Sequence, residues 1–289
     1  MVADTDWPRH ALDGADPERL ECTLTRPEGR RSLTRYRSYI LCTSPRSGST
    51  LLCGLLAATG RAGNPDSHFH EPSLAQWLED YNLAPGSFAA ERDALAAVFD
   101  AARTRGSGDT GLFGLRLQRH SFGFFLRKLD VLHPGLACDR DRIRAAFGET
   151  LFLHLTRSDK LAQAISYVKA GQTGLWHRAP DGTELERLAP QAAPVYDADA
   201  IARQIREFTA FDAAWRDWFA REGIAPLQLS YDALSADPAT ALAGVLDALG
   251  LDRGLAAGIR PPVAKLADAT NRDWTTRFLA EGGSRQKSD

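Results

Sequence analysis

The sequence is short of cysteine, of long apolar runs and of net charge, and each shortage argues against a class of protein. Its four cysteines form no CxxC pair and no zinc-finger spacing with histidine. No apolar stretch approaches the roughly 20 residues that cross a bilayer, and the polar, acidic residues 1–10 do not resemble a secretory signal. The formal net charge of −2 provides no broad basic field for a polyanion such as nucleic acid.

The setting of the cysteines favours a reducing compartment. Cys42 and Cys53 lie in apolar runs, where a reduced thiol packs as a small hydrophobic group. We therefore predict a cytoplasmic protein with no transmembrane segment and no nucleic-acid partner. No pattern of acidic residues indicates a magnesium site, and we expect no metal.

What the sequence does contain is an alternation of buried strands and helices. The 289 residues are 44% hydrophobic and 25% charged, which is enough apolar material for a substantial core. Short apolar runs predict strands at residues 39–43, 112–117, 151–155 and 227–229. Helical periodicity predicts helices at residues 49–59, 159–170, 201–218 and 239–249. This order predicts an α/β fold, a P-loop-like three-layer α/β/α arrangement around a mostly parallel central sheet.

Two segments depart from the alternation. Residues 1–36 are polar, contain three prolines and show no period, so we predict an N-terminal extension followed by a single domain over residues 37–289. Residues 171–194 carry turn residues and proline, and they predict a long excursion over the sheet edge. Long loops on a rigid scaffold often line substrate sites.

The most informative motif is residues 43–50, between the first predicted strand and helix. A loop there aims backbone N–H groups and the positive end of the helix at one point, which forms an anion site. Gly48 lets the backbone approach a ligand, and three hydroxyls can donate further hydrogen bonds; they belong to Ser47, Ser49 and Thr50.

This loop differs from the nucleoside-triphosphate loop G-x-x-x-x-G-K-[ST]. Thr43 stands at the first glycine position and Ser49 at the lysine position, while Arg46 lies inside the loop. A ligand with a short anionic chain is therefore favoured over a magnesium triphosphate. A nucleotide kinase or NTPase with a degenerate loop, and a tight turn without a ligand, are the alternatives.

A second anion-binding signal follows the strand predicted at residues 151–155. Arg157 stands where this strand ends, at the usual ligand edge of an open α/β sheet, and its planar fork suits phosphate oxygens. Ser166 lies about two turns into the following helix. The alternative is a surface ion pair for Arg157 and no ligand for Ser166.

Taken together, these residues resemble the bacterial trehalose 2-sulfotransferase-like family. The likeness runs from about Tyr39 to Phe278. Its points are the ordered motifs at residues 44–52, 58–65, 111–117, 156–159, 163–166 and 231–234, together with Gln172, Thr173 and Trp176. The loop alone is moderately specific, whereas the ordered combination is strong.

The resemblance implies a sulfotransferase that moves a sulfuryl group from 3′-phosphoadenosine-5′-phosphosulfate to a hydroxyl of a carbohydrate or glycolipid, leaving 3′,5′-adenosine bisphosphate. It implies that residues 46–50 hold the 5′-phosphosulfate and that Arg157 with Ser166 holds the 3′-phosphate. Tyr231 is expected near the nucleotide, and Lys265 is expected to close over the donor. The resemblance also suggests a homodimer.

The acceptor side of the resemblance rests on a different set of residues. Gln172, Thr173 and Trp176 are expected to shape the acceptor pocket, because an aromatic face beside polar groups suits a sugar. Arg116 is expected to bind the transferred group or an acidic acceptor, with a structural role as the alternative. Arg46 is expected to neutralise the leaving group without a metal.

The sequence departs from this family at the expected general base. The relatives carry a P-x-E motif after the first helix, with the glutamate as base, whereas this chain has Ser67 at that position. His70 is the preferred base because histidine titrates near neutrality, followed by His68 and Glu71, with Asp66 less favoured. The missing glutamate also leaves open a catalytically dead module that only binds the nucleotide.

Overall fold

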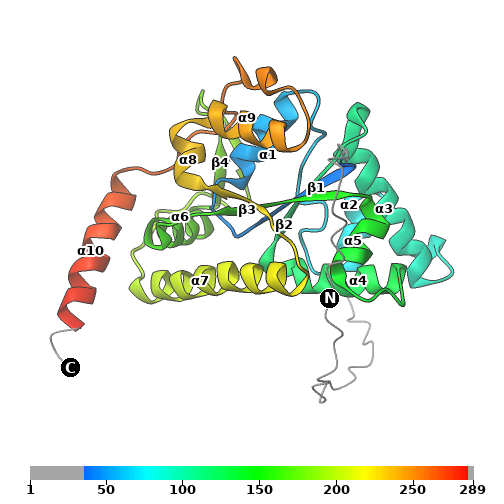
Figure 1. Ribbon diagram of the computed structural model, residues 1–289. Coiled ribbons are helices and arrows are strands. Elements are labelled where there is room, and N and C mark those ends of the chain that lie inside the picture. The colour runs from blue at the N-terminus through cyan, green and yellow to red at the C-terminus, as the bar shows by residue number, and fades with distance from the viewer. Residues whose placement is uncertain (1–35, 286–289) are drawn as a thin grey trace.

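The computed structural model describes residues 36–285, so the extension predicted at residues 1–36 lies almost wholly outside the described residues. Its centre is a four-stranded sheet in the order β2-β1-β3-β6 with every neighbouring pair parallel. The strands are β1 (Ser38–Thr43), β2 (Phe113–Gln118), β3 (Thr150–Thr156) and β6 (Leu227–Ser230). Figure 1 shows this sheet between two layers of helices.

Strand β1 explains why helices cover both faces of the sheet. Its side chains alternate between two apolar clusters, with Ile40 and Cys42 in one and Tyr39 and Leu41 in the other. All four are fully buried. A strand buried on both faces needs a helical layer on each side, which confirms the predicted three-layer α/β/α fold.

One layer consists of α1 (Ser49–Ala58), α8 (Tyr231–Ala236) and α9 (Pro238–Ala248), with the 3-10 helix η3 (Arg253–Ala256) beside α9. The opposite layer is larger (Figure 1). It contains α2 (Leu74–Asp80), α3 (Glu91–Ser107), α4 (Arg119–Leu132), α5 (Asp139–Phe147) and α7 (Ala198–Arg221). The short 3-10 helices η1 (Pro85–Ser87) and η2 (Gly108–Thr110) flank α3.

The larger layer is held by an aromatic core. Phe69 lies at its centre, with ring centroids 4.6 Å from Phe99, 5.0 Å from Trp77 and 5.2 Å from Phe125. Each such ring buries a large apolar area, and offset or edge contacts add further stabilisation. No helix within residues 36–285 is long and apolar enough to cross a membrane.

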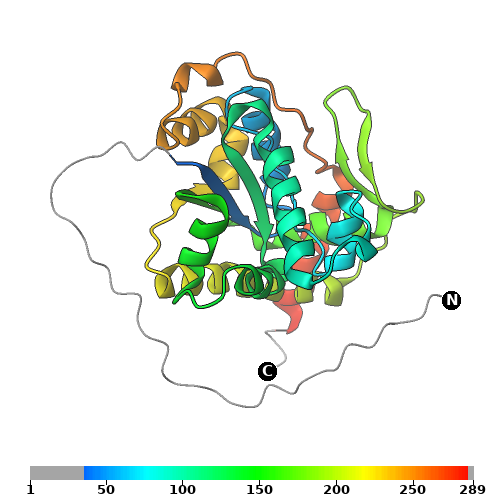
Figure 2. The same ribbon diagram turned by 90° about the vertical axis from the view of Figure 1, so that its right-hand side faces the viewer.

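The excursion predicted at residues 171–194 follows α6 (Lys160–Thr173) and contains an antiparallel hairpin of β4 (Leu175–Arg178) and β5 (Glu184–Arg187). Figure 2 shows this hairpin standing off the body. The segment before the last helix, α10 (Ala269–Arg285), runs beside it, because Ala264 N–H donates to the Arg178 carbonyl at 2.8 Å.

Candidate functional site

The four parallel strands end at one edge of the sheet, and each brings a polar side chain there. β1 leads into residues 44–48, and β2 carries Arg116 two residues before its end. β3 is followed by Arg157, and β6 by Tyr231. Since β1 lies between β2 and β3, the strand order reverses here, and open α/β sheets bind ligands at such a point.

A cleft of about 1100 Å³ opens over this edge. It is lined by most of the residues predicted for the site: Arg46, Gly48, Ser49, Thr50, His70, Glu71, Arg116, Arg157, Ser166, Trp176, Tyr231 and Lys265. These residues come from segments that lie far apart in the sequence. The fold therefore brings most of the predicted donor residues, together with Arg116 and Trp176 of the predicted acceptor side, into one cavity.

The loop after β1 has the backbone shape of an anion cradle. Gly48 has a φ of 88° and caps α1 without any side-chain hydrogen bond, so the first N–H groups of the helix face the cleft edge uncapped. A Cβ on Gly48 would lie 2.6 Å from Cδ2 of Tyr231. Glycine is therefore required here both for the left-handed backbone and for the close approach of the ring.

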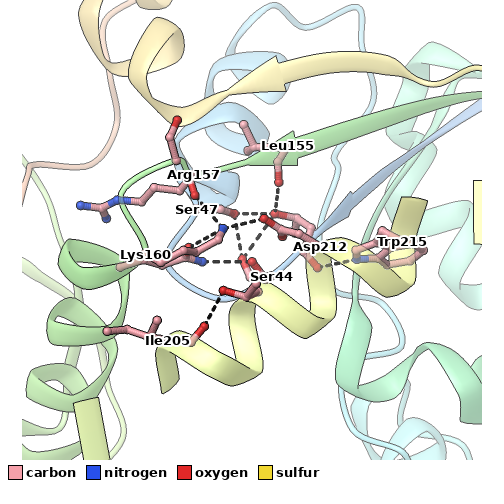
Figure 3. Close-up of polar contacts among 12 residues, drawn as sticks. Ser44, Ser47, Leu155, Arg157, Lys160, Ile205, Asp212 and Trp215 are labelled. Carbon is pink, nitrogen blue, oxygen red and sulfur yellow. Dashed lines mark hydrogen bonds and ion pairs between the residues drawn. The ribbon is translucent and has the colours of Figure 1, made fainter. Parts of the chain in front are cut away.

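Not every hydroxyl of this loop faces the cleft. Ser47 was predicted to bind the donor, but its fully buried Oγ donates to the Ser44 carbonyl at 2.8 Å and contacts Thr43 Oγ1 (Figure 3). Its side chain supports the loop from inside. Ser49 and Thr50, by contrast, line the cleft.

The two predicted anion-binding arginines lie together. Arg157 Nη1 donates to the Arg46 carbonyl at 3.2 Å, and Arg46 Nε donates to Ser166 Oγ at 3.0 Å. The Arg157 guanidinium also stacks over the ring of Tyr231, 4.4 Å from its centroid. These four of the residues predicted to bind the nucleotide thus meet in one place.

Burial disfavours the charge of both arginines, and nearby acidic residues such as Glu186 and Asp232 offset this only in part. Burial, and then the neighbouring charge of Arg157, lower the pKa of Arg46 to about 10. Burial also lowers the pKa of Arg157, whose Nε is buried without a hydrogen-bond partner among the described residues. An anion bound at each guanidinium group would offset its charge, and an anion at Arg157 would also satisfy that donor.

Arg116 joins the loop after β1 to the loop after α1. Its Nη1 donates to Thr50 Oγ1 at 2.8 Å, its Nε to Ser67 Oγ at 2.7 Å, and its Nη2 to Asp66 Oδ1 at 3.2 Å. Ser67, which stands at the glutamate position of the relatives, therefore lies beside the helix end that forms the anion cradle.

The four base candidates differ in their surroundings. His70 and Glu71 line the cleft, with Nε2 of His70 3.6 Å from Oε1 of Glu71. Burial, and then the neighbouring His120, lower the pKa of His70, which keeps the ring neutral and able to accept a proton near pH 7. Asp66 is paired with Arg116.

His68 lies away from the cleft. Its ring is buried, stacks on Phe113 at 5.7 Å, and contacts the Tyr81 hydroxyl through Nδ1 at 3.1 Å and the Asn64 carbonyl through Nε2 at 3.4 Å. With both nitrogens engaged inside the protein, a role in packing fits His68 better than proton transfer.

The predicted acceptor residues are divided among three places. Trp176 lines the main cleft, and its carbonyl accepts from Arg46 Nη1 at 2.7 Å. Thr173 lines an adjoining hollow of about 940 Å³, which shares Lys265 with the main cleft. Gln172 lines neither cavity, and its amide exchanges two hydrogen bonds with the backbone of Val195, at 2.9 and 2.8 Å.

His177 also belongs to the site, although the sequence did not indicate it. Its Nε2 lies 3.0 Å from Thr50 Oγ1 and 3.3 Å from Oε2 of Glu186 on β5. Burial, followed by the charges of Arg46 and Arg116, lowers the pKa of His177 to about 4. The one sequence signal for His177 is its position next to Trp176 in residues 171–194. Nothing in the sequence shows that the hairpin folds back onto α1.

The residues of the cleft are suited to binding anions. Arginines, hydroxyls and the uncapped N–H groups of α1 converge at the sheet edge. Within residues 36–285, no group of three or more His, Cys, Asp or Glu side chains could hold a metal ion.

Comparison with known proteins gives concordant results. A family model described as Stf0 sulphotransferase matches residues 38–281. The chain is 32% identical over 265 residues to the trehalose 2-sulfotransferase of Mycobacterium tuberculosis (strain ATCC 35801 / TMC 107 / Erdman), covering 85% of this chain and 95% of that protein. It is 28% identical over 261 residues to the trehalose 2-sulfotransferase of Mycolicibacterium smegmatis, covering 83% and 94%.

Two solved structures were also matched. A sulfotransferase from Alicyclobacillus acidocaldarius has a TM-score of 0.40 and 15% identity, covering 86% of this chain and 94% of that one. The sulfotransferase domain from the Synechococcus PCC 7002 olefin synthase has a TM-score of 0.35 and 19% identity, covering 87% and 86%.

Proposed function

This chain belongs to the Stf0 sulphotransferase family, and from that premise we propose that it transfers a sulfuryl group from 3′-phosphoadenosine-5′-phosphosulfate to a hydroxyl of a carbohydrate or glycolipid. The observation that carries the proposal is the meeting of Arg46, Arg157 and Ser166 in one cleft. Two relatives named trehalose 2-sulfotransferase support a sugar acceptor. The matched range supports one sulfotransferase domain over residues 37–289.

The residues present fit such a donor. Its two anionic ends need two cationic pockets. Two groups of donors suit these ends: Nε of Arg157, which is buried without a hydrogen-bond partner among the described residues, and the N–H groups at the start of α1, which have no side-chain cap from Gly48. We assign Arg46, Gly48, Ser49 and Thr50 to the phosphosulfate end. The 3′-phosphate would be held by Arg157 with Ser166, beside Tyr231. When bound, the donor supplies the sulfuryl group.

The chemistry of the remaining residues follows from their positions. His70, neutral and facing the cleft, is placed to accept the proton of the acceptor hydroxyl as its oxygen forms a bond to sulfur, with Glu71 beside it to stabilise the imidazolium. Arg46 and the α1 N–H groups would stabilise the charge that develops on the leaving phosphate oxygen. Trp176, and Lys265 over the donor, would complete the cleft.

A test uses substitution of each anion-binding arginine. Arg46→Ala and Arg157→Ala should each abolish transfer from the labelled donor to a panel of sugars, because each removes one of two cationic pockets. Arg103→Ala is the matched control, since Arg103 lies on α3 and pairs with the exposed Asp100. Near-normal turnover by either cleft variant would reject the assignment, and magnesium-dependent ATP turnover would favour the kinase alternative.

A further inference from the structure

Beneath the cleft lies a buried polar network centred on Lys160, the first residue of α6 (Figure 3). Its ammonium donates to the Arg157 carbonyl at 2.6 Å, to Oε1 of Gln163 at 3.2 Å and to Oδ2 of Asp212 at 2.5 Å. An ammonium group has three hydrogens, and these contacts use all of them. Lys160 therefore has no donor left for a ligand, and its role must be exerted through its neighbours.

Gln163 carries the network from Lys160 to the loop after β1. While its Oε1 accepts from Lys160, its Nε2 donates to Ser44 Oγ at 3.0 Å and to the Pro45 carbonyl at 2.7 Å. The side chain is fully buried. One ammonium thus fixes both the end of β3, which carries Arg157, and the loop that carries Arg46.

The loop needs this support at Arg46. Its backbone φ is 61°, a left-handed conformation that is uncommon for a non-glycine residue and persists only where the surroundings hold it. The carbonyl before it, of Pro45, is held by Gln163, and its own carbonyl is held by Arg157 Nη1 at 3.2 Å. The strained residue is therefore held on both sides by groups that Lys160 contacts.

Helix α7 closes the network from the opposite layer. Asp212 accepts from Lys160, and Trp215, one turn later, donates from Nε1 to the Thr43 carbonyl at 3.0 Å (Figure 3). The side chains of Lys160 and Asp212 are only 18% and 9% exposed, and Oδ1 of Asp212 has no hydrogen-bond partner among the described residues. A buried ion pair with an unsatisfied oxygen is poor evidence for stability.

We propose that Lys160, Gln163 and Asp212 are positioning residues of the donor site: they set Arg46 and Arg157 at the spacing that one doubly anionic nucleotide requires. The proposal rests on the proposed function for the identity of that nucleotide. A misplacement of about 1 Å can cost about 100-fold in rate, so a network that fixes two guanidinium groups relative to each other acts on donor binding without touching the donor.

The test separates positioning from stability with two variants. Lys160→Met leaves Asp212 as an unpaired buried charge, so it should lower both the melting temperature and donor affinity. The double variant Lys160→Met with Asp212→Leu removes both charges and should restore the melting temperature. If the network positions the site, the double variant should still show a donor KM raised about tenfold or more, with the acceptor KM unchanged.

The single variant Gln163→Leu should also raise the donor KM and leave the acceptor KM unchanged. The control is Arg142→Met, because Arg142 is 16% exposed and pairs with Asp130 at 2.8 Å between α4 and α5; its donor KM should stay at the wild-type value. A double variant that regains normal donor KM together with its melting temperature would overturn the proposal, since the pair would then be only structural.

A ligand-free measurement keeps this result independent of the proposed function. Hydrogen–deuterium exchange of peptides covering residues 43–50 should be faster in the double variant than in wild type, and unchanged exchange would overturn the positioning role. A wild-type protein that fails to bind 3′,5′-adenosine bisphosphate would instead overturn the proposed function, while the exchange comparison would still decide the network.

Discussion

The smallest features on which the cleft depends are two left-handed backbone positions two residues apart. Arg46 adopts this conformation at φ 61° with a side chain that the site requires, and Gly48 adopts it at φ 88° because no side chain fits. The two residues keep this left-handed conformation for different reasons. Arg46 is held by hydrogen bonds on both of its flanking carbonyls, whereas Gly48 is pressed against the ring of Tyr231.

Gly48→Ala should therefore reduce donor affinity strongly. The new Cβ would lie 2.6 Å from Tyr231, so the ring, and with it the Arg157 guanidinium that stacks on it, must move. Gly60→Ala is the matched control, because Gly60 also has a positive φ of 61°, but apart from its chain neighbours no atom of the described residues lies within 4 Å of its Cβ position. The control should lose about 1 kcal/mol of stability and keep the wild-type affinity for the bisphosphate nucleotide in calorimetry. Equal affinities for the two variants would contradict this account.

The pH dependence of transfer should report His70. Because burial and His120 lower its pKa below the ordinary histidine value of about 6.5, the ring is neutral and competent at pH 7, and activity should fall only as the pH drops below that value. His70→Asn should lower kcat and remove this acidic limb from the pH–rate profile. His68→Asn should instead lower the melting temperature and keep the limb, since His68 is buried away from the cleft. An unchanged profile for His70→Asn would exclude His70 as the base.

At the scale of helices and strands, the sequence predicted those elements whose apolar pattern is unbroken. Every predicted strand and helix is present, with ends that differ by three residues at most. Among the helices without a predicted range, α2 to α5 combine charged residues with aromatic residues that point into the core, as in Glu91–Ser107, where Val98 and Phe99 are buried within a run of acidic, basic and alanine residues. Their apolar faces become clear only once Phe69 and the sheet supply a partner.

The hairpin shows a second limit of prediction. Residues 171–194 were expected to line the substrate site, and several of them do line the cleft. What local patterns could not show is that β4 is held on the loop after β1 and on α1 by contacts between residues more than 100 positions apart, Arg46 with Trp176 and Thr50 with His177. No local pattern encodes such contacts. His177 and Glu186 were missed for this reason, whereas Ser47 turns inward through local contacts with Ser44 and Thr43. The cleft positions of Arg46, Arg157 and Ser166 could be predicted because each follows a strand or lies on a helix that the apolar pattern defines.

The contact of this hairpin with α1 should be sensitive to pH and to the donor. The pKa of His177 is lowered to about 4, against about 6.5 in an unfolded chain. Between these values the unfolded state binds more protons, so stability present above pH 6.5 is lost as the pH falls towards 4. His177→Gln should flatten the loss of melting temperature across this window.

Binding of an anion should change this titration. Part of the shift comes from Arg46 and Arg116, so 3′,5′-adenosine bisphosphate, by offsetting charge at the cleft, should raise the pKa of His177. An NMR titration of the imidazole, with the resonance assigned from the His177→Gln spectrum, measures this directly. An identical midpoint with and without the nucleotide would show that the anion does not bind beside these arginines.

At the scale of the whole molecule, the cleft is made by the sheet rather than by any one segment. Residues at the ends of all four parallel strands line it, and the helical layers on both faces hold those ends in register, α1 and α8 from one side and α7 from the other. A ligand that contacts several strand ends at once binds only the folded chain. Binding of this ligand therefore raises the free energy of unfolding, by an amount that grows with the ligand concentration relative to its Kd.

Thermal unfolding with a matched set of nucleotides should therefore show whether two anion pockets act together. At about 100-fold excess over its Kd, 3′,5′-adenosine bisphosphate should add about 2.7 kcal/mol and raise the melting temperature by roughly 5 to 10 °C. Adenosine 5′-monophosphate, which lacks the 3′-phosphate, should raise it less at the same concentration, and ATP should not exceed the bisphosphate. In Arg157→Ala the difference between bisphosphate and monophosphate should disappear, because the pocket for the 3′-phosphate is gone, whereas Arg46→Ala should weaken the effect of both. A larger shift with ATP, or a difference that survives in Arg157→Ala, would mean that Arg46 and Arg157 do not grip opposite ends of one nucleotide.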